Sequence, residues 1–276
     1  MGKLLLGTTD ITPILMSTGI RRQISNGTWS FPASSFTFDI PHNVTTIGSY
    51  AVAYAFRACT TLTGIDLSSV ETLNSAALYY AFYGCTGLTG TMDLSSLTTT
   101  AGSSLAYTFY GCTNITGADF SSLSIATGTN TIGYTFRGCT KLETISFPAL
   151  TRIGTNNSTA NYGHFAYCLY GCTKVTELRF PELTAIYSTG GSTAAYGTFS
   201  YNNYVQKMYF PKLTTLTYGS GATSANQAAV KNTFVNCSAL TELHFAEANQ
   251  AAIQASPGYD TAWGRGAANV TIYFDL

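Results

Sequence analysis

Hydrophobic residues recur along this chain in a phrase with a fixed order of apolar and polar positions. In its clearest copy, Ile145 and Phe147 alternate with polar residues, and Leu150 and Ile153 follow. Alternation with a period of two is typical of a short strand with one buried face. Pro148 ends this strand because proline has no amide hydrogen for the ladder of a sheet. Each copy of the phrase therefore predicts one short β-strand.

The copies follow one another at intervals of 26 to 35 residues, which indicates a stack. The residues that close the predicted strands are Ile40, Leu67, Leu94, Phe120, Phe147, Phe180, Phe210, Phe245 and Phe274. Connections of this length are too long for hairpins, so neighbouring strands are expected to run in the same direction. The pattern predicts an α/β-type repeat solenoid, a right-handed stack with one parallel β-sheet of about nine short strands. Short helical or 3-10 turns and loops are expected on its other side.

A second phrase, Phe-x-x-Cys, precedes most of these strands. Its copies are Phe56/Cys59, Phe82/Cys85, Phe109/Cys112, Phe136/Cys139 and Phe234/Cys237, with Leu169/Cys172 as a near copy and Phe199/Asn202 as a degenerate one. Six of the seven cysteines thus share one repeat position and are expected to stack with parallel side chains, which do not converge for disulfides. We expect free, buried thiols that act as small apolar fillers. Cys168 lies outside this column and is the cysteine for which reactivity is suspected.

The repeats are expected to form one elongated domain, because each unit buries its apolar side only against the next unit. Residues 36–247 are assigned to the solenoid. Residues 1–35, with Trp29 and a polar outer face at Arg21 and Arg22, do not fit the repeat and are predicted to form an amino-terminal cap. Residues 248–276 are predicted to form a carboxy-terminal cap with a last strand and with Trp263 over its end.

The combined pattern Cys-x-x-Leu-x-x-Ile-x-Phe-Pro-x-Leu-x-x-Ile and Ala-x-x-Phe-x-x-Cys resembles the leucine-rich repeats of the BspA type, also called the Treponema pallidum type. The resemblance covers about residues 36–247 and implies adhesion or ligand binding at a bacterial surface. The chain departs from the pattern at Asn202, which replaces a cysteine, and at Ala248 and Ala251, which replace the Leu and Ile after a strand.

The composition limits the classes of partner that this chain is expected to bind. Charged residues make up 9% of the chain, with 13 Lys and Arg balanced by 13 Asp and Glu, and no basic cluster favours a nucleic-acid partner. No apolar run reaches the roughly 18 residues that a membrane-spanning helix needs. Lys3 and the leucines after it resemble the start of a signal peptide, but Thr8, Thr9 and Asp10 interrupt the run, so no secretory signal is expected as written. An extracellular or bacterial cell-surface location is still expected, or a virion if the gene is from a phage.

Signatures of catalysis are missing from the sequence. His42, His164 and His244 lie far apart in the order of the repeats. The chain has neither a Gly-x-Ser-x-Gly elbow nor a phosphate-binding Gly-Lys-Ser/Thr loop. We therefore expect a protein without enzymatic activity and without a cofactor.

Three features remain as candidates for function, and the first is the outward position of each strand. This column contains Asp66, Asp93, Asp119, Ser146, Arg179, Tyr209 and His244. Stacked carboxylates repel one another unless they are solvated or neutralised. Asp66, Asp93 and Asp119 are therefore weak candidates for a cation site, since oxygen ligands suit calcium. A solvated polar face is the favoured alternative, whereas Arg179, Tyr209 and His244 are candidates for ligand binding.

The second feature is a column of tyrosines two residues before the repeat Phe or Leu. It contains Tyr54, Tyr80, Tyr107, Tyr134 and Tyr167, with Tyr83, Tyr110 and Tyr170 beside it. Exposed aromatic rows can stack on the apolar faces of sugar rings, so this column is a candidate glycan site. In the alternative, which is favoured, the rings pack on one another and serve only the stack.

The third feature is the variable segment between repeats, longest at 154–163, 187–195 and 217–229 and rich in Gly, Ser, Thr, Asn and Ala. Such inserts project from one edge of a solenoid and could form a partner site, or they could simply be tolerated changes of length. The sequence predicts a non-catalytic binding or adhesion module that engages a glycan or protein through an extended face. A phage tail or fibre protein and a purely structural spacer are the alternatives.

Overall fold

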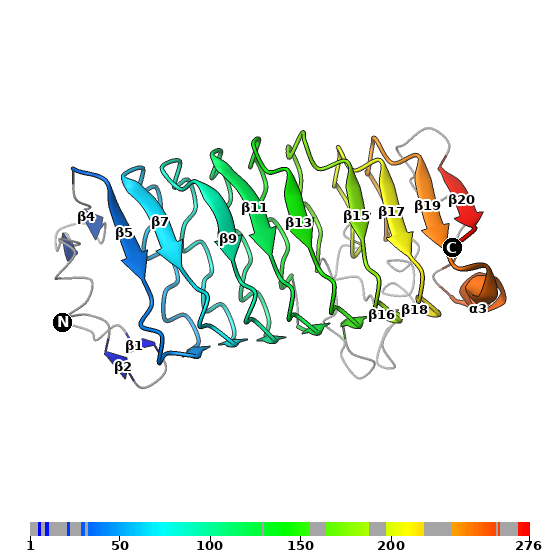
Figure 1. The fold of residues 1–276 in the computed structure, drawn as a ribbon, viewed down its shortest axis with the longest axis horizontal. Coiled ribbons are helices and arrows are strands. Elements are labelled where there is room, and N and C mark those ends of the chain that lie inside the picture. Colours follow the sequence, from blue (N-terminus) through cyan, green and yellow to red (C-terminus); the bar gives the residue numbers. More distant parts are fainter. Residues whose placement is uncertain are drawn as a thin grey trace.

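In a computed structural model, the described residues between 36 and 274 form an elongated stack of rungs (Figure 1). The structure describes residues 33–128, 130–154, 164–187, 197–217, 233–257, 259 and 270–276. Before residue 33 it describes the backbone of four short strands. They are β1 (Leu5–Leu6) with β2 (Thr9–Asp10), and β3 (Arg21–Arg22) with β4 (Trp29–Ser30), each pair antiparallel. The division into two caps and a solenoid stays a prediction.

Nine parallel strands line one side of the stack, which we call the strand face. They are β5 (Phe36–Asp39), β7 (Leu62–Asp66), β9 (Gly90–Asp93), β11 (Ile115–Asp119), β13 (Thr144–Ser146), β15 (Glu177–Arg179), β17 (Lys207–Phe210), β19 (Glu242–Phe245) and β20 (Thr271–Phe274). The predicted parallel repeat stack is confirmed. Its hydrogen bonding differs from the prediction of a single sheet, because the strands form three sheets: β5-β7, β9-β11-β13 and β15-β17-β19-β20.

A second parallel sheet, which was not predicted from the sequence, forms from the residues that follow each Leu-Thr or its equivalent, Val-Thr, Val-Glu or Leu-Ser. Its strands are β6 (Thr46–Ile47), β8 (Thr72–Leu73), β10 (Thr99–Thr100), β12 (Ile125–Ala126), β14 (Arg152–Ile153), β16 (Ala185–Tyr187) and β18 (Thr215–Thr217). All seven pair in one unbroken sheet. Strands of two or three residues carry too little alternation to be recognised from sequence, and only stacking of the rungs gives them partners.

The third side of each rung, which we call the turn face, is a series of β-turns. Left-handed φ angles of +50° to +81° recur at every fourth residue, at Tyr50, Tyr54 and Ala58, at Ala76, Tyr80 and Gly84, at Ser103, Tyr107 and Gly111, at Asn130, Tyr134 and Gly138, and at Tyr167 and Gly171. Backbone N–H groups alternate between two acceptors: Tyr54 donates to Tyr79 in the next rung, and Ala55 donates to Val52 in its own. The expected turns are therefore present, but in the described rungs they are not helical.

Left-handed backbone costs a residue other than glycine about 1–2 kcal/mol, so its repetition needs compensation. The bonds between rungs supply part of it, since Tyr80 and Phe82 donate to Ala106 and Thr108 of the next rung. Stacking of the tyrosine rings supplies a further part of the compensation. At the third position, as at Gly138 with φ +76°, glycine avoids the cost.

Two columns of phenylalanine fill the core. Beneath the turn face, Phe56, Phe82, Phe109 and Phe136 stack with ring centroids 5.4 to 5.6 Å apart. At the ends of the strands, Phe120, Phe147, Phe180, Phe210 and Phe245 stack at 5.0 to 5.8 Å. Both columns belong to one core that continues to Ile253 of the short helix α3 (Gln250–Ala255), which follows the 3-10 turn η1 (Glu247–Asn249).

The cysteines are free and buried, as predicted. Their role goes beyond filling space, because five of the six repeat thiols donate to a phenylalanine carbonyl of the preceding rung, whereas that of Cys59 contacts the Thr61 hydroxyl. The five bonds, Cys85 to Phe56, Cys112 to Phe82, Cys139 to Phe109, Cys172 to Phe136 and Cys237 to Phe199, have Sγ to O distances of 2.9 to 3.1 Å. Burial raises the pKa of Cys112, Cys172 and Cys237 to about 12, so these groups remain protonated donors.

Asn202 replaces a cysteine because the turn segment of its rung is shorter. Tyr167 donates its backbone N–H to Ser200, which aligns Tyr167 with Tyr201. The rung then ends early, and the Oδ1 atom of Asn202 accepts from the backbone N–H of Leu169 at 2.8 Å. Its Nδ2 group donates to the carbonyls of Phe165 and Phe199 at 3.1 and 2.7 Å. The amide thus supplies an acceptor and two donors where a thiol supplies one donor.

Candidate binding surfaces

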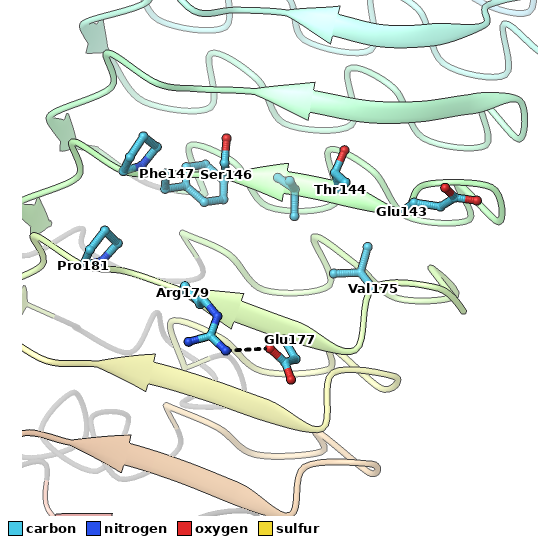
Figure 2. Close-up of a pocket in the computed structure, with 10 residues that line it drawn as sticks. Glu143, Thr144, Ser146, Phe147, Val175, Glu177, Arg179 and Pro181 are labelled. Atoms are coloured by element: carbon cyan, nitrogen blue, oxygen red, sulfur yellow. Dashed lines mark hydrogen bonds and ion pairs between the residues drawn. The ribbon is translucent and has the colours of Figure 1, made fainter. Parts of the chain in front are cut away.

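A groove of about 420 Å³ lies on the strand face between β13 and β15 (Figure 2). It lies where the hydrogen-bonded sheet is interrupted. Backbone N–H groups at the ends of several other strands bond to the next rung, as Phe120 does to Ser146 at 3.2 Å. Between these two described rungs, the equivalent bond from Phe147 to Arg179 is not formed. The strands separate here and open the surface.

The floor of the groove is apolar and its walls are polar. Ile145 is partly exposed, whereas Ala118, Leu178 and Met208, which occupy the same position in other rungs, are buried. Thr144 of β13 lies on one wall (Figure 2). On the other wall, Glu177 and Arg179 of β15 form an ion pair of 2.9 Å (Figure 2). Such a groove offers an apolar contact together with hydroxyl and charged groups.

Beside the groove, four outward side chains form a continuous row. The Arg179 guanidinium lies 3.8 Å from the centroid of the Tyr209 ring. Tyr209 stacks on His244 at 4.6 Å, and His244 stacks on Tyr273 at 4.7 Å. The structure therefore brings the predicted residues Arg179, Tyr209 and His244 together. Tyr273 was not among the predicted residues, although its position before Phe274 matches that of the other three before the residues that close their strands.

His244 is held between two carboxylates. Its Nε2 atom lies 3.0 Å from Glu242, and its Nδ1 atom lies 3.0 Å from Asp275. A carboxylate only accepts hydrogen bonds, so both contacts are complete when the imidazole carries both protons. Glu242 also pairs with Lys207 at 2.9 Å. At this end of the strand face, Glu242 therefore links Lys207 to His244 in one polar network.

Each of the three aspartates of the candidate cation site is the last residue of its strand, in β7, β9 and β11. Asp66, Asp93 and Asp119 accept the backbone N–H of the serine two residues later, each at 2.9 Å. Hydrogen bonds from the Ser68 side chain and backbone also lower the pKa of Asp66. No group of three or more possible metal ligands occurs among the described residues. This geometry gives the aspartates a structural role and adds nothing in favour of calcium.

The tyrosine column of the turn face is a ladder of stacked rings. Tyr54, Tyr80, Tyr107, Tyr134, Tyr167 and Tyr201 follow one another with centroids 4.1 to 5.3 Å apart and interplanar angles of 9° to 16°. Each inner ring therefore has both of its faces against neighbouring tyrosines. A sugar has no access to those faces, so the geometry agrees with the alternative in which the rings serve the stack.

A second column lies beside the tyrosine ladder at the position after the repeat Phe or Leu. Its members are Arg57, Tyr83, Tyr110, Arg137 and Tyr170. Tyr83 stacks on Tyr110 at 4.7 Å. The Arg137 guanidinium lies 4.7 Å from the centroid of Tyr170, and that of Arg57 lies 5.1 Å from Tyr83. These arginines were not among the predicted residues, although they share a repeat position with three tyrosines.

The remaining candidates for chemistry are buried. Cys168 is 1% exposed, and burial raises the pKa of its thiol, which argues against the suspected reactivity. His164 is fully buried, neither ring nitrogen has a hydrogen-bond partner among the described residues, and burial lowers its pKa to about 4. The variable inserts 154–163, 187–195 and 217–229, like Trp263, lie almost wholly outside the described residues. Within the described part, no helix has the length and apolar character to cross a membrane.

Comparison with protein families decides the identity of the repeat. The family model for the BspA-type leucine-rich repeat region, with 6 copies, matches residues 22–158, 53–189 and 107–225. These matches together cover more than half of the chain. The chain belongs to the BspA-type leucine-rich repeat family. The resemblance drawn from the Cys-x-x-Leu and Phe-x-x-Cys phrases is thereby confirmed.

One solved structure similar to this BspA-type chain is a leucine-rich cell surface protein from Faecalibacterium prausnitzii A2-165. The two sequences are 15% identical, and the match covers 92% of this chain and 86% of the other, with a TM-score of 0.25. No curated protein sequence matches the chain significantly. Membership of the family therefore depends on the repeat itself.

Proposed function

We propose that this BspA-type repeat protein is a non-catalytic binding module of a bacterial cell surface or secreted protein. In this proposal, the strand face engages a protein or glycan ligand at the groove between β13 and β15. The observation that supports it is the interrupted sheet, which leaves Ile145 partly exposed beside the row that begins at Arg179. A stack that served only as a spacer would gain stability by closing this gap, because burial of apolar surface is favourable.

The chemistry of the groove suits a ligand with both apolar and polar groups. Ile145 and Val175 offer apolar contacts, while Thr144, Glu177 and Arg179 offer donors and acceptors. The aromatic row that continues through Tyr209 would extend the contact along the stack axis. Small polar groups around an apolar floor are typical of specific binding sites.

The test begins with a screen of the purified chain against a glycan array and a panel of surface proteins. Any ligand found is then measured with Thr144→Arg, which places a long side chain at the groove. Thr91→Arg is the matched control, because Thr91 and Thr144 pair with the same residue, Gly117, from opposite sides and both are exposed. We expect at least tenfold weaker binding for Thr144→Arg and unchanged binding for Thr91→Arg.

Equal affinity of both variants would remove the groove from the proposal. If the screen finds no ligand, the structural spacer is favoured. If the gene lies among tail or fibre genes, a phage protein is favoured.

A further inference from the structure

The turn face differs from the rest of the described chain in its charges. Within the segments 48–60, 74–86, 101–113, 130–140 and 164–173, Arg57 and Arg137 are the only Lys, Arg, Asp or Glu residues. The described ion pairs lie in other segments, where they join Lys174 to Glu143, Arg179 to Glu177, Lys207 to Glu242, Lys212 to Glu182, and His244 to Glu242 and Asp275. The turn face thus carries two positive charges and no negative charge.

The two guanidinium groups lie on aromatic rings instead of on carboxylates. Arg137 lies 4.7 to 5.9 Å from the ring centroids of Tyr110, Tyr134, Tyr167 and Tyr170. Contacts of this kind orient a guanidinium but leave its charge unneutralised, and the N–H donors remain suited to an anion. No ion pair of Arg57 or Arg137 occurs in the described chain. Charge complementarity therefore favours an acidic partner.

The tyrosines around the arginines do not supply that negative charge. Burial raises the pKa of Tyr80 to about 12, with a smaller contribution from Tyr107, and burial also raises the pKa of Tyr107. These two phenols are therefore neutral at physiological pH. The phenol of Tyr107 interacts with those of Tyr80 and Tyr134, so polar groups repeat along the ladder. Tyr54 and Tyr170, 45% and 37% exposed, extend this surface toward solvent.

The spacing of the ladder distinguishes between two kinds of acidic polymer. The rings repeat every 4.1 to 5.3 Å along the stack axis. In an extended peptide, side chains on one side repeat about every 6.6 Å, which is two residues of a strand. In an extended polysaccharide, one pyranose ring advances the chain by about the length of one rung. A sugar polymer would therefore keep in register with successive rungs, whereas a peptide would not.

We propose that the turn face binds an acidic polysaccharide, which lies along the stack with its carboxylate or sulfate groups on Arg57 and Arg137. The sugar hydroxyls contact the edges and hydroxyls of the tyrosines, because the ring faces are occupied by the stack. The two arginines lie three rungs apart, or about 14 Å at the usual strand spacing, so one chain of a few sugars bridges both. This surface is distinct from the groove of the strand face, and the proposal does not depend on the one above.

The proposal is tested by calorimetric titration of the chain with polygalacturonate, which carries carboxylates, and with heparin, which carries sulfates. Neutral dextran and polyglutamate of matched length are the comparison polymers. We expect binding of at least one acidic polysaccharide that weakens with added salt, with no binding of dextran and at least tenfold weaker binding of polyglutamate. The preference between the two acidic polysaccharides identifies the anionic group.

The Arg57→Gln and Arg137→Gln double variant is expected to bind at least tenfold more weakly. Lys174→Gln with Lys212→Gln is the matched control, because it removes two positive charges from other parts of the surface and is expected to leave affinity unchanged. Arg57 is exposed, so Arg57→Gln alone preserves the fold and should weaken binding severalfold even if the double variant is unstable. The absence of binding to either acidic polysaccharide, equal binding of polyglutamate, or equal loss in the control would overturn the proposal.

Discussion

The strand face and the turn face are built from the same repeat, yet they differ in continuity. On the turn face, the rings of Tyr54 through Tyr201 stack without a gap. On the strand face, hydrogen bonding stops between β7 and β9 and again between β13 and β15. Ile65 and Ile145, which are partly exposed, lie at these two interruptions. The comparison indicates that the turn side fixes the stack, whereas the strand side is free to open.

The reason for this difference is the number of interactions that each rung makes with the next. Beneath the turn face, a rung contributes a stacked Phe, a stacked Tyr and a thiol bonded to the preceding rung, as Phe109, Tyr107 and Cys112 do. On the strand face, a rung contributes a strand of three to five residues. Loss of a few hydrogen bonds there leaves the other two sides intact.

The largest test of this comparison removes one apolar side chain from each side. Phe109→Ala, within the buried column, is expected to lower the free energy of unfolding by about 3–5 kcal/mol. Ile145→Ala, at the floor of the groove, is expected to cost clearly less, because its side chain is already partly exposed. Urea denaturation of both variants measures the difference. Equal losses would mean that the strand face stabilises the stack as much as the turn side does.

A second test concerns the shortened rung. Asn202→Ala would leave the buried Leu169 N–H without its acceptor, at about 1–3 kcal/mol. The carbonyls of Phe165 and Phe199 would each lose one donor but keep the Cys168 N–H and the Cys237 thiol. We expect a loss of about 2–4 kcal/mol in total. Asn202→Cys, which restores the repeat residue, should recover only part of this stability, because a thiol supplies only one hydrogen-bond donor. Full recovery in thermal melting would contradict the role given to the amide.

A third test uses the buried His164. Its pKa falls from 6.5 to about 4 on folding, so between these values the unfolded chain binds more protons than the folded chain. Stability from this residue is therefore complete above pH 6.5 and decreases as the pH falls toward 4, by at most about 3 kcal/mol. His164→Thr should remove this dependence, since buried threonines occupy the same position at Thr131 and Thr198. Melts at pH 7 and pH 4.5 measure it, and an unchanged pH dependence would show that His164 is not the cause.

The smallest expected effect concerns the aspartates of the strand face. Each accepts one backbone N–H, so Asp119→Ala is expected to cost about 1 kcal/mol. Millimolar calcium should not shift the melting temperature, because each carboxylate closes a turn in its own rung. A rise of the melting temperature with calcium, abolished by Asp93→Asn and Asp119→Asn, would instead support a cation site at these aspartates.

Much of the solenoid could be predicted because its signal is periodic. The nine strand-closing residues and the Phe-x-x-Cys column recur at fixed positions, and stacking multiplies the same local pattern. The second sheet could not be predicted, since strands such as Thr72–Leu73 are too short to show a period. The interruption at Ile145 was equally hidden, because its sequence is the best copy of the repeat.

The candidate sites were likewise predictable only in part. Sequence order alone placed Arg179, Tyr209 and His244 in one outward column, and the structure brings them into contact. It could not show whether the faces of Tyr107 and Tyr134 are open or covered, since a column of rings in sequence permits either arrangement. Ring orientation depends on side-chain packing between rungs, and so does the place of Arg137 among four tyrosines.

By itself, the sequence determined that identical units must stack, that their strands run in parallel and that their cysteines align, because each unit has an apolar side that only a neighbour can cover. The tertiary structure alone decided where the stack opens, which aromatic faces remain accessible and which charges lack partners. Those properties arise from contacts between residues about 27 or more positions apart. The local sequence pattern does not determine the distances between such residues.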